Sequence, residues 1–435
     1  MMPKQLLFCF ILMCLTVAGF CQQETQLFYK ANDDLTEVIV YDVFSPPVAS
    51  RIYYYSAVAA YETILRAHQK SSFISLCNQL NQLKKLPNPS AKINPALAGI
   101  SAFYNTAIHF VFSEQKLKVL FQKTLTSYSE IKNQDRNLYQ RSLNYGKQIS
   151  DSILEWSKND NYAYTRKLRR YNFSKTPGKW IPTPPAYFAA VEPYWSKMRT
   201  AIKNSSDTCT IQGPLLYSTD SSSDFYRQAK EVLSVSNTLS SEQKDIANFW
   251  DCNPFKVNTS GHLLFAAKKL SPGAHWMNIV NICSRKQHAD LLTAAAAYAI
   301  AAITIYDAFI HCWAEKYKSN LIRPETYINA NLDANWRPIL QTPPFPEYPS
   351  GHSVISTAAA IVLTDFFGDN FKFDDDTEMM YGLPVRSFSS FVAAANEAAI
   401  SRLYGGIHFR AAIENGQELG KKTGGYVLKY IRIRP

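Results

Sequence analysis

Residues 343–352 read PPFPEYPSGH, and they end in the middle one of three short blocks in the last third of the chain. In chain order the blocks are Lys316-(six residues)-Arg323-Pro324, Pro349-Ser350-Gly351-His352 and Ser401-Arg402-(five residues)-His408. They combine three cations, a hydroxyl, a glycine amide and two imidazoles, with no carboxylate among their fixed positions. Guanidinium and ammonium groups are typical ligands of oxyanions. We therefore expect a tetrahedral oxyanion to bind between the blocks, beside a nucleophilic histidine nitrogen.

The local sequence predicts how each block presents its side chains. The two basic residues of the first block lie close to two helical turns apart, and the following proline disfavours helix, so we expect Arg323 at a helix end. The middle block directly precedes a helical pattern, whose start offers free amides to an anion. Gly351 would let the backbone approach an oxygen closely. In the last block, Gly405-Gly406 should turn the chain and direct both functional side chains to the same anion.

The composition is that of a globular protein. The chain has 435 residues, of which 46% are hydrophobic and 13% aromatic, enough for one large or two ordinary domains. The net charge of +11 favours small anionic partners. The strongest basic run, Arg166, Lys167, Arg169 and Arg170, predicts a solvated face, and without a nucleic-acid fold signature we do not expect nucleic acid as a partner.

The N-terminus has the pattern of an export signal. Lys4 precedes an apolar stretch, Leu6 to Ala18, that is too short to span a bilayer. Gly19 and Cys21 supply small residues before Gln22. We predict a signal peptide at residues 1–21 and an exported protein, periplasmic or secreted. A lipid anchor on Cys21 is disfavoured, because Phe20 stands where a small residue is wanted.

The cysteines of the mature chain are Cys77, Cys209, Cys252, Cys283 and Cys312. Their odd number and irregular spacing indicate neither a disulfide framework nor a zinc cluster. One bridge, involving Cys209, stays open as an alternative. Otherwise we expect buried thiols that pack as small apolar groups.

The apolar periodicity predicts an all-α protein. Helices are expected at 48–66, 94–113, 117–132, 137–158, 227–233, 241–250, 291–313, 353–367 and 387–404, with irregular segments at 159–187 and 203–224. The segment Leu291 to Phe309 is long enough to span a membrane, but Asp307 lies inside it. We interpret it as a core helix that delivers Lys316, and expect no transmembrane span in the mature chain. An N-terminal helical region, 22–290, and a catalytic core, 291–435, should form one compact unit, and a homo-oligomer is compatible with the sequence.

Together the three blocks resemble the signature of the superfamily that joins vanadium-dependent haloperoxidases with type 2 phosphatidic acid phosphatases and bacterial acid phosphatases. The run at 343–352 is most similar to soluble haloperoxidases, as are residues 45–61, 179–186 and 249–251. The spacing of the blocks is most similar to that of marine bacterial vanadium iodoperoxidases. The resemblance implies a helical bundle with its active site between core helices.

The resemblance also implies roles for the residues of the blocks. His408 would bind vanadate or attack phosphorus, and His352 would be the acid–base group. The remaining oxyanion contacts would be Lys316, Arg323, Ser350, Gly351 and Arg402, with Lys316 also polarising bound peroxide. Trp313 and Phe345 match aromatic positions of the haloperoxidase pocket, and Asp251 is a candidate carboxylate that orients His352. Ala314 and Phe255 depart from the pattern, since polar pocket residues are expected there.

Two chemistries share this set of residues. A haloperoxidase would hold vanadate on His408 and use hydrogen peroxide to oxidise a halide, iodide or bromide. A phosphatase would hydrolyse phosphomonoesters or lipid phosphates through a phosphohistidine at His408 and would need no cofactor. The aromatic pair and the long region before the blocks favour the haloperoxidase. A binding protein for phosphate or vanadate is a third alternative, disfavoured because both histidines are intact.

Overall fold

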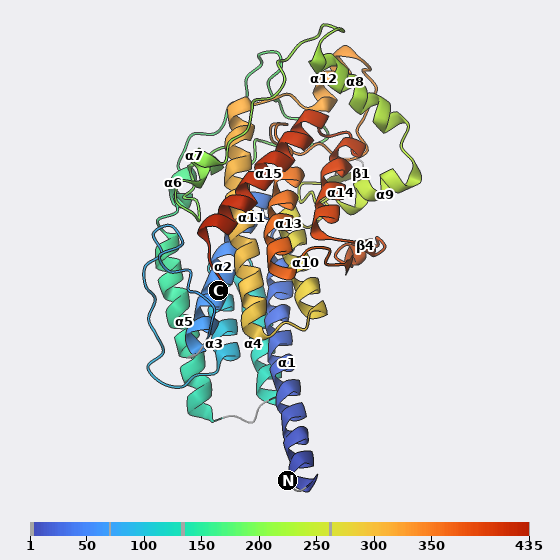
Figure 1. Ribbon diagram of the computed structural model, residues 1–435. Helices are drawn as coiled ribbons and strands as arrows, with labels where there is room; N and C mark the ends of the chain where they lie inside the picture. The colour runs from blue at the N-terminus through green and yellow to red at the C-terminus, as the bar shows by residue number, and fades with distance from the viewer. Residues whose placement is uncertain (1–3, 69–70, 132–134, 261–262, 435) are drawn as a thin grey trace.

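The computed structural model describes residues 4–68, 71–131, 135–260 and 263–434. Helices make up 59% of the chain and strands 2% (Figure 1). The all-α prediction is therefore confirmed. The two small antiparallel sheets pair only two short strands each.

Five helices form the N-terminal part of the bundle. They are α1 (Lys4–Tyr41), α2 (Pro46–Ala67), α3 (Pro95–Ile108), α4 (Glu114–Ile131) and α5 (Arg136–Ser157). Prolines occupy the first turns of α2 and α3, where a missing amide proton costs nothing. Helix α3 packs between α2 and α5, and α1 packs on α3 and α4.

The middle of the chain is less regular, as the sequence predicts. It contains α6 (Tyr162–Thr165), η1 (Trp195–Lys197), α7 (Ser205–Thr208), α8 (Asp224–Asn237), α9 (Ser241–Phe249), β1 (Val257–Ser260) and β2 (Leu263–Ala266). Helix α9 starts with a capping box, in which Ser240 and Gln243 bond each other's backbone amides. It leads into the loop at 250–253, which borders the site described below.

The C-terminal part contains the remaining elements. They are α10 (Pro272–Lys286), α11 (Leu291–Ser319), α12 (Pro324–Asn331), α13 (Gly351–Phe367), β3 (Phe373–Asp375), η2 (Met379–Tyr381), β4 (Arg386–Phe388), α14 (Phe391–Tyr404) and α15 (Arg410–Tyr430). Helix α13 packs on α11, α14 and α15, and α11 packs on α2. A single hydrophobic cluster runs from Leu27 to Ile433, so both parts of the chain share one core.

Helix α11 is the core helix that the sequence predicts. Among the helices of the described ranges it alone has the length and hydropathy of a membrane span, and 94% of its most apolar window is buried inside the protein. Its buried carboxylate is satisfied internally, since Asp307 accepts from the backbone amides of Ala201 (2.6 Å) and Ile202 (3.2 Å). Helices on several sides, rather than lipid, therefore account for its apolar surface.

Glycines allow α13 and α15 to approach each other closely. Gly416, Gly420 and Gly424 of α15 face α13, and a Cβ built on Gly420 would lie 2.6 Å from the carbonyl oxygen of Val354. Because the middle sequence block forms the start of α13, this contact also fixes the position of the block.

Helix α1 continues without a break across the predicted cleavage point before Gln22. Residues after that point pack into the core, among them Leu27, Phe28, Leu35 and Val38. In Figure 1 the first turns of α1 extend away from the other helices. The predicted mature chain would therefore begin where α1 joins the packed body of the protein.

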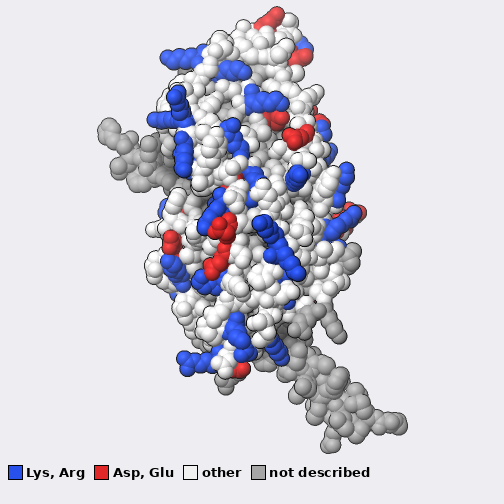
Figure 2. All heavy atoms as spheres, turned by 90° about the vertical axis from the view of Figure 1, so that its left-hand side faces the viewer, with Lys and Arg blue, Asp and Glu red and all other residues white. Residues whose placement is uncertain are grey.

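The surface charge is dispersed. On the face shown in Figure 2, Lys and Arg side chains are spread over the surface with Asp and Glu among them. The basic run at 166–170 is solvated, as predicted, since all four of its basic residues are exposed. Within this run Arg166 pairs with Glu192 and lies over the ring of Tyr162.

Candidate active site

The three sequence blocks meet around one small cavity. It lies between the end of α11, the start of α13 and the turn from α14 to α15, and its volume is about 30 Å³. Side chains of the middle and last blocks line it, together with aromatic groups and the loop after α9; they include Asp251, Phe255, Trp313, Phe345, His352, Arg402 and His408.

Lys316 sits in the last turn of α11, fully buried. Its Nζ donates to the backbone carbonyls of Pro346 (3.0 Å), Glu347 (3.0 Å) and Pro349 (2.5 Å). Burial lowers the pKa of Lys316 to about 7, and the charge of Arg323 acts in the same direction. The loop before α13 is thus tied to this ammonium group, whose proton is held only weakly near neutral pH.

The position of Arg323 corrects one expectation. Helix α11 ends at Ser319, where Asn320 adopts a left-handed conformation, and Arg323 is the N-cap of α12 rather than the end of α11. Its Nε donates to the carbonyl of Phe345 (2.9 Å) and its Nη1 to that of Ile407 (2.9 Å). Its Nη2 is buried without a hydrogen-bond partner in the described part of the chain. Burial lowers the pKa of this guanidinium to about 10, so it remains charged at neutral pH.

The middle block forms the start of α13, as predicted. Ser350 is the N-cap and accepts a hydrogen bond from the amide of Ser353 (3.3 Å). A Cβ built on Gly351 would lie 3.9 Å from the ring of Trp313, so the glycine faces the aromatic wall of the cavity. The first amides and the positive end of α13 thus lie beside the cavity, an arrangement that favours anions.

His352 is held as a neutral base. It hydrogen-bonds with the backbone of Trp250, and its Nε2 is buried without a partner among the described residues. Burial lowers its pKa well below the usual value, and the charge of Arg402 lowers it further. An unprotonated Nε2 that lines the cavity can accept a proton there.

The glycine turn brings Arg402 and His408 to the same cavity, as the sequence predicts. Helix α14 ends at Tyr404, and Gly406 adopts a positive φ of 74° that favours glycine. Arg402 donates from Nε to Ser401 (2.9 Å) and from Nη2 to the carbonyl of Trp250 (2.7 Å). Burial lowers the pKa of Arg402 to about 10, which still leaves it charged.

His408 is oriented by a carboxylate that stands outside the fixed positions of the blocks. Its Nδ1 lies 2.9 Å from Oε1 of Glu347, which also accepts from the amide of Phe409 (2.8 Å). Its Nε2 lies 3.2 Å from Nη1 of Arg323. Burial and then the charge of Arg323 lower the pKa of His408 well below its usual value. The ring is therefore neutral, with a proton on Nδ1 directed to Glu347 and a lone pair on Nε2.

The aromatic pair lies where the sequence indicates. The ring centroids of Trp313 and Phe345 are 5.0 Å apart, and both rings line the cavity. Phe345 also covers two of the cations, at 5.1 Å from Nζ of Lys316 and 5.1 Å from Cζ of Arg323. Phe255 lines the cavity as well, while Ala314 is only half-buried and stands apart from it. The site is thus a set of buried cations and neutral imidazoles inside an apolar wall.

Comparison with solved structures places this arrangement in a family. The crystal structure described as the first bacterial vanadium-dependent iodoperoxidase matches with a TM-score of 0.88 and 45% sequence identity, over 94% of this chain and 97% of that one. The chain belongs to the vanadium-dependent haloperoxidase family. A family model for the second helical-bundle domain of the VCPO type matches residues 296–433. No curated protein sequence matches.

A more distant member shares the fold of this vanadium haloperoxidase. The structure of a bacterial vanadium-dependent chloroperoxidase in its holo form matches with a TM-score of 0.67 and 15% identity, over 89% of this chain and 93% of that one. The helical-bundle fold predicted from the resemblance is therefore confirmed.

Asp251 has a different environment from the one expected in this vanadium haloperoxidase. It accepts from Nζ of Lys256 (2.9 Å) and of Lys269 (3.1 Å) and is almost fully buried. The group that hydrogen-bonds with His352 is the Trp250 backbone, next to it in the chain. A backbone carbonyl, rather than the Asp251 carboxylate, therefore contacts His352 in the structure. The charge of Asp251 instead raises the pKa of Arg402, against the lowering by burial.

Sequence reasoning missed two groups of this haloperoxidase site. Glu347 lies inside the run at 343–352, but only the fold shows that its carboxylate meets His408. The Trp250 carbonyl, which serves both Arg402 and His352, has no side-chain signal at all. The one hint in the sequence was a glutamate two residues before the Pro-Ser-Gly-His block.

Proposed function

We propose that this protein is a vanadate-dependent haloperoxidase that oxidises iodide or bromide with hydrogen peroxide. The observation that carries the proposal is the match of 45% identity to an iodoperoxidase over nearly the whole chain. The site supports it: Gly351, Arg402 and both histidines line one cavity. Arg323 contacts His408, and Lys316 lies beside Gly351. The phosphatase alternative is not favoured, because the relative that matches over nearly the whole chain is a haloperoxidase.

The residues present fit vanadate. Nη2 of Arg323 is a buried donor and Nε2 of His352 a buried acceptor, and both lack partners among the described residues. An oxygen of the oxyanion would accept from Nη2, and a hydroxyl group on it would donate to Nε2. His408 would bind the vanadium through Nε2, and the oxygens would lie against Lys316, Arg323, Arg402 and the start of α13, at Ser350 and Gly351. When bound, vanadate supplies a Lewis-acidic V(V) centre that activates hydrogen peroxide toward a halide.

Each residue then has a definite task. Glu347 holds the Nδ1–H of His408 and so directs its Nε2 lone pair into the site. His352 would accept a proton from hydrogen peroxide at Nε2 and would pass it to the oxygen that leaves as water. Lys316 and the two arginines stabilise negative charge in an environment with little water, where such charges interact strongly. Trp313 and Phe345 keep bulk water out.

The test compares the two chemistries in one preparation. Metal-free protein is assayed for iodide oxidation with peroxide, with and without added vanadate, beside hydrolysis of p-nitrophenyl phosphate. We expect iodide oxidation only with vanadate, and phosphate ester hydrolysis that is weak and inhibited by vanadate. Strong hydrolysis by metal-free protein, with no halide oxidation after vanadate is added, would refute the proposal.

We also propose that residues 1–21 are a signal peptide and that the mature protein is exported. The packing of residues after Gln22 into the core supports this boundary. Mass spectrometry of the protein purified from its native host should find an N-terminus close to Gln22. An intact N-terminus on the cytoplasmic protein would contradict it.

A further inference from the structure

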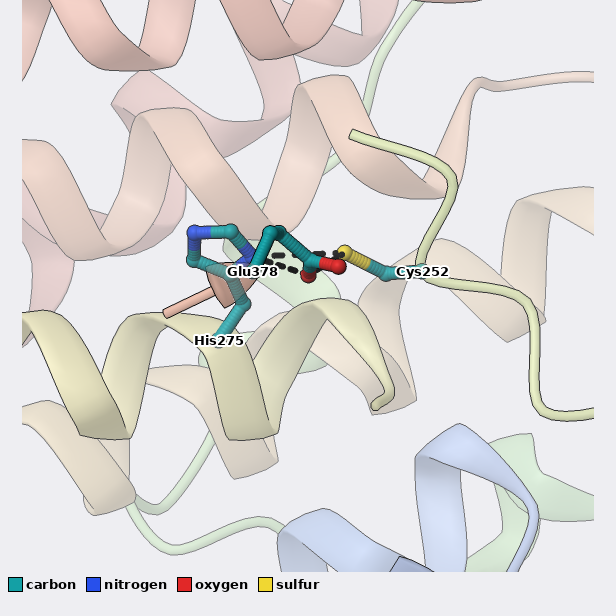
Figure 3. A group of neighbouring side chains, drawn as sticks. All are labelled: Cys252, His275 and Glu378. Atoms are coloured by element: carbon teal, nitrogen blue, oxygen red, sulfur yellow. Dashed lines mark hydrogen bonds and ion pairs between the residues drawn. The ribbon is translucent and has the colours of Figure 1, made fainter. Parts of the chain in front are cut away.

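A second group of buried side chains lies behind the active site. Figure 3 shows Cys252, His275 and Glu378 pointing toward one another. They come from the loop after α9, from α10 and from the N-cap of η2, so the fold and not the local sequence brings them together. All three side chains are buried. Among the described residues they form a group whose ligand atoms all lie within 4.8 Å of one another.

The distances within the group match the edges of a tetrahedral metal site. Sγ of Cys252 lies 3.4 Å from Nδ1 of His275 and 3.8 Å from Oε1 of Glu378. Nδ1 of His275 lies 3.2 Å from the same Oε1. Zinc bonds of about 2.3 Å to sulfur and about 2.0–2.2 Å to nitrogen and oxygen give tetrahedral edges of roughly 3.4–3.6 Å. An ion could therefore enter with side-chain shifts of a few tenths of an ångström.

Asp375 supplies the outer support that a metal-binding histidine requires. Its Oδ2 lies 2.7 Å from Nε2 of His275, the ring nitrogen that faces away from the cluster. Its other oxygen accepts from the amide of Thr377 (3.0 Å), which fixes the carboxylate. A carboxylate on the far nitrogen holds a histidine in the orientation and tautomer that a metal needs.

Glu378 provides an independent sign of a missing partner. Its Oε2 is buried and has no hydrogen-bond partner among the described residues, although its side chain is 1% exposed. A buried carboxylate oxygen is costly unless it is hydrogen-bonded, ion-paired or bound to a metal.

We propose that Cys252, His275 and Glu378 bind one structural zinc ion, with Asp375 as the positioning residue for His275. The mixed sulfur, nitrogen and oxygen ligands suit zinc, and Oε2 of Glu378 or a water completes four-coordination. On binding, Sγ of Cys252 and Nδ1 of His275 each lose a proton to solvent and bond to the ion, which stays Zn²⁺. Neither redox change nor substrate contact is involved.

The ion would fasten three segments that meet beside the active site. The loop that carries Cys252 also carries Trp250, whose carbonyl accepts from Arg402 (2.7 Å) and whose ring stacks on His275, with centroids 4.6 Å apart. The proposed zinc site adjoins the oxyanion cavity, which Cys252 also lines, but none of its three ligands belongs to the sequence blocks. Zinc binding is therefore expected with or without vanadate.

The test measures zinc directly, on protein without a histidine tag. Chelator-treated protein is titrated with Zn²⁺ by calorimetry, and its metal content is measured after gel filtration. We expect one Zn²⁺ per chain and a higher melting temperature. Cys252→Ser should lose the ion, Asp375→Asn should weaken binding about 10- to 100-fold, and Cys209→Ser, which removes another buried thiol, should bind as wild type does.

A spectroscopic measurement on the unmodified sequence keeps the test decisive if a variant fails to fold. Co²⁺ in the site should give the visible bands of a tetrahedral ion and a thiolate-to-cobalt charge-transfer band in the near ultraviolet. Absence of that band, or zinc binding that Cys252→Ser and Cys209→Ser leave equally intact, would overturn the proposal.

Discussion

At the scale of residues, the contact between Glu347 and His408 orients the histidine that is proposed to bind vanadium. Glu347 holds the Nδ1–H of His408 at 2.9 Å, so the ring offers its Nε2 lone pair in a fixed direction. Replacing Glu347 by Ala frees the ring, and we expect the affinity for vanadate to fall about 10- to 100-fold. Vanadate titration of iodide oxidation measures this affinity.

The matched control for that variant is Glu315→Ala. Glu315 belongs to the same end of α11, and its buried side chain pairs with the exposed Lys318. Its replacement should leave vanadate affinity unchanged. Equal affinities for the Glu347→Ala variant and wild type would contradict the orienting role.

The low pKa of Lys316 predicts that the affinity for vanadate depends on pH. Burial lowers its pKa to about 7, so in the free protein the ammonium is present below that pH and is lost above it. A bound anion favours the protonated form, hence the dissociation constant for vanadate should increase as the pH rises above about 7.

The comparison with Lys316→Met separates this effect from the titration of vanadate itself. The variant lacks the charge at every pH, so its dissociation constant should exceed that of wild type at pH 6 and approach it at pH 9. A ratio of the two constants that does not change with pH would show that Lys316 does not titrate in this range.

The residues of the blocks could be predicted as site residues, because each block is short and its internal spacing resembles the family signature. Glu347 could not, since its role depends on a contact with a residue 61 positions later. Likewise, odd and irregular cysteines gave no sign of a metal site, yet the fold places Cys252 beside His275 and Glu378. The five cysteines after residue 21 are all free, so the alternative of a bridge at Cys209 is wrong in this structure.

At the scale of elements, the close contact of α13 and α15 predicts that alanine substitution at two glycines of α15 changes stability in opposite directions. Gly420→Ala would place a methyl group 2.6 Å from a carbonyl oxygen of α13 and should cost about 1–3 kcal/mol of unfolding free energy. A methyl group at Gly425, on the exposed side of α15, would have no atom within 4 Å. Gly425→Ala should therefore raise the free energy of unfolding by about 0.5–1 kcal/mol.

Urea unfolding of the two variants beside wild type checks this prediction. Because α13 starts with Ser350, Gly351 and His352, the Gly420→Ala variant should also lose haloperoxidase activity, while the Gly425→Ala variant should retain it. Equal stabilities of the two variants would contradict the tight packing of these helices.

Apolar periodicity predicted most of the long helices within a few residues, but it did not predict α1, α10, α12 or α15. The α10 sequence carries polar residues such as His275 and Asn281 at positions that the fold buries. Helix α15 contains four glycines, which lower helix propensity and weaken the pattern. Three of those glycines serve the contact with α13, so a tertiary requirement outweighs local preference.

At the scale of the whole molecule, one hydrophobic core unites the N-terminal helices with the C-terminal part that carries the blocks. Sequence blocks alone left two chemistries open, since both use the same donors. The match over nearly the full length, including the region before the blocks, decides for the haloperoxidase family.

The most direct test of the account is whether vanadate binds at His408. Wild type, His408→Ala and His109→Ala, an exposed control histidine, are incubated with vanadate, gel-filtered and analysed for vanadium content and for iodide oxidation. We expect one vanadium per chain and full activity in wild type and His109→Ala, and the loss of both in His408→Ala. A His408→Ala variant that still bound vanadium and oxidised iodide would contradict it.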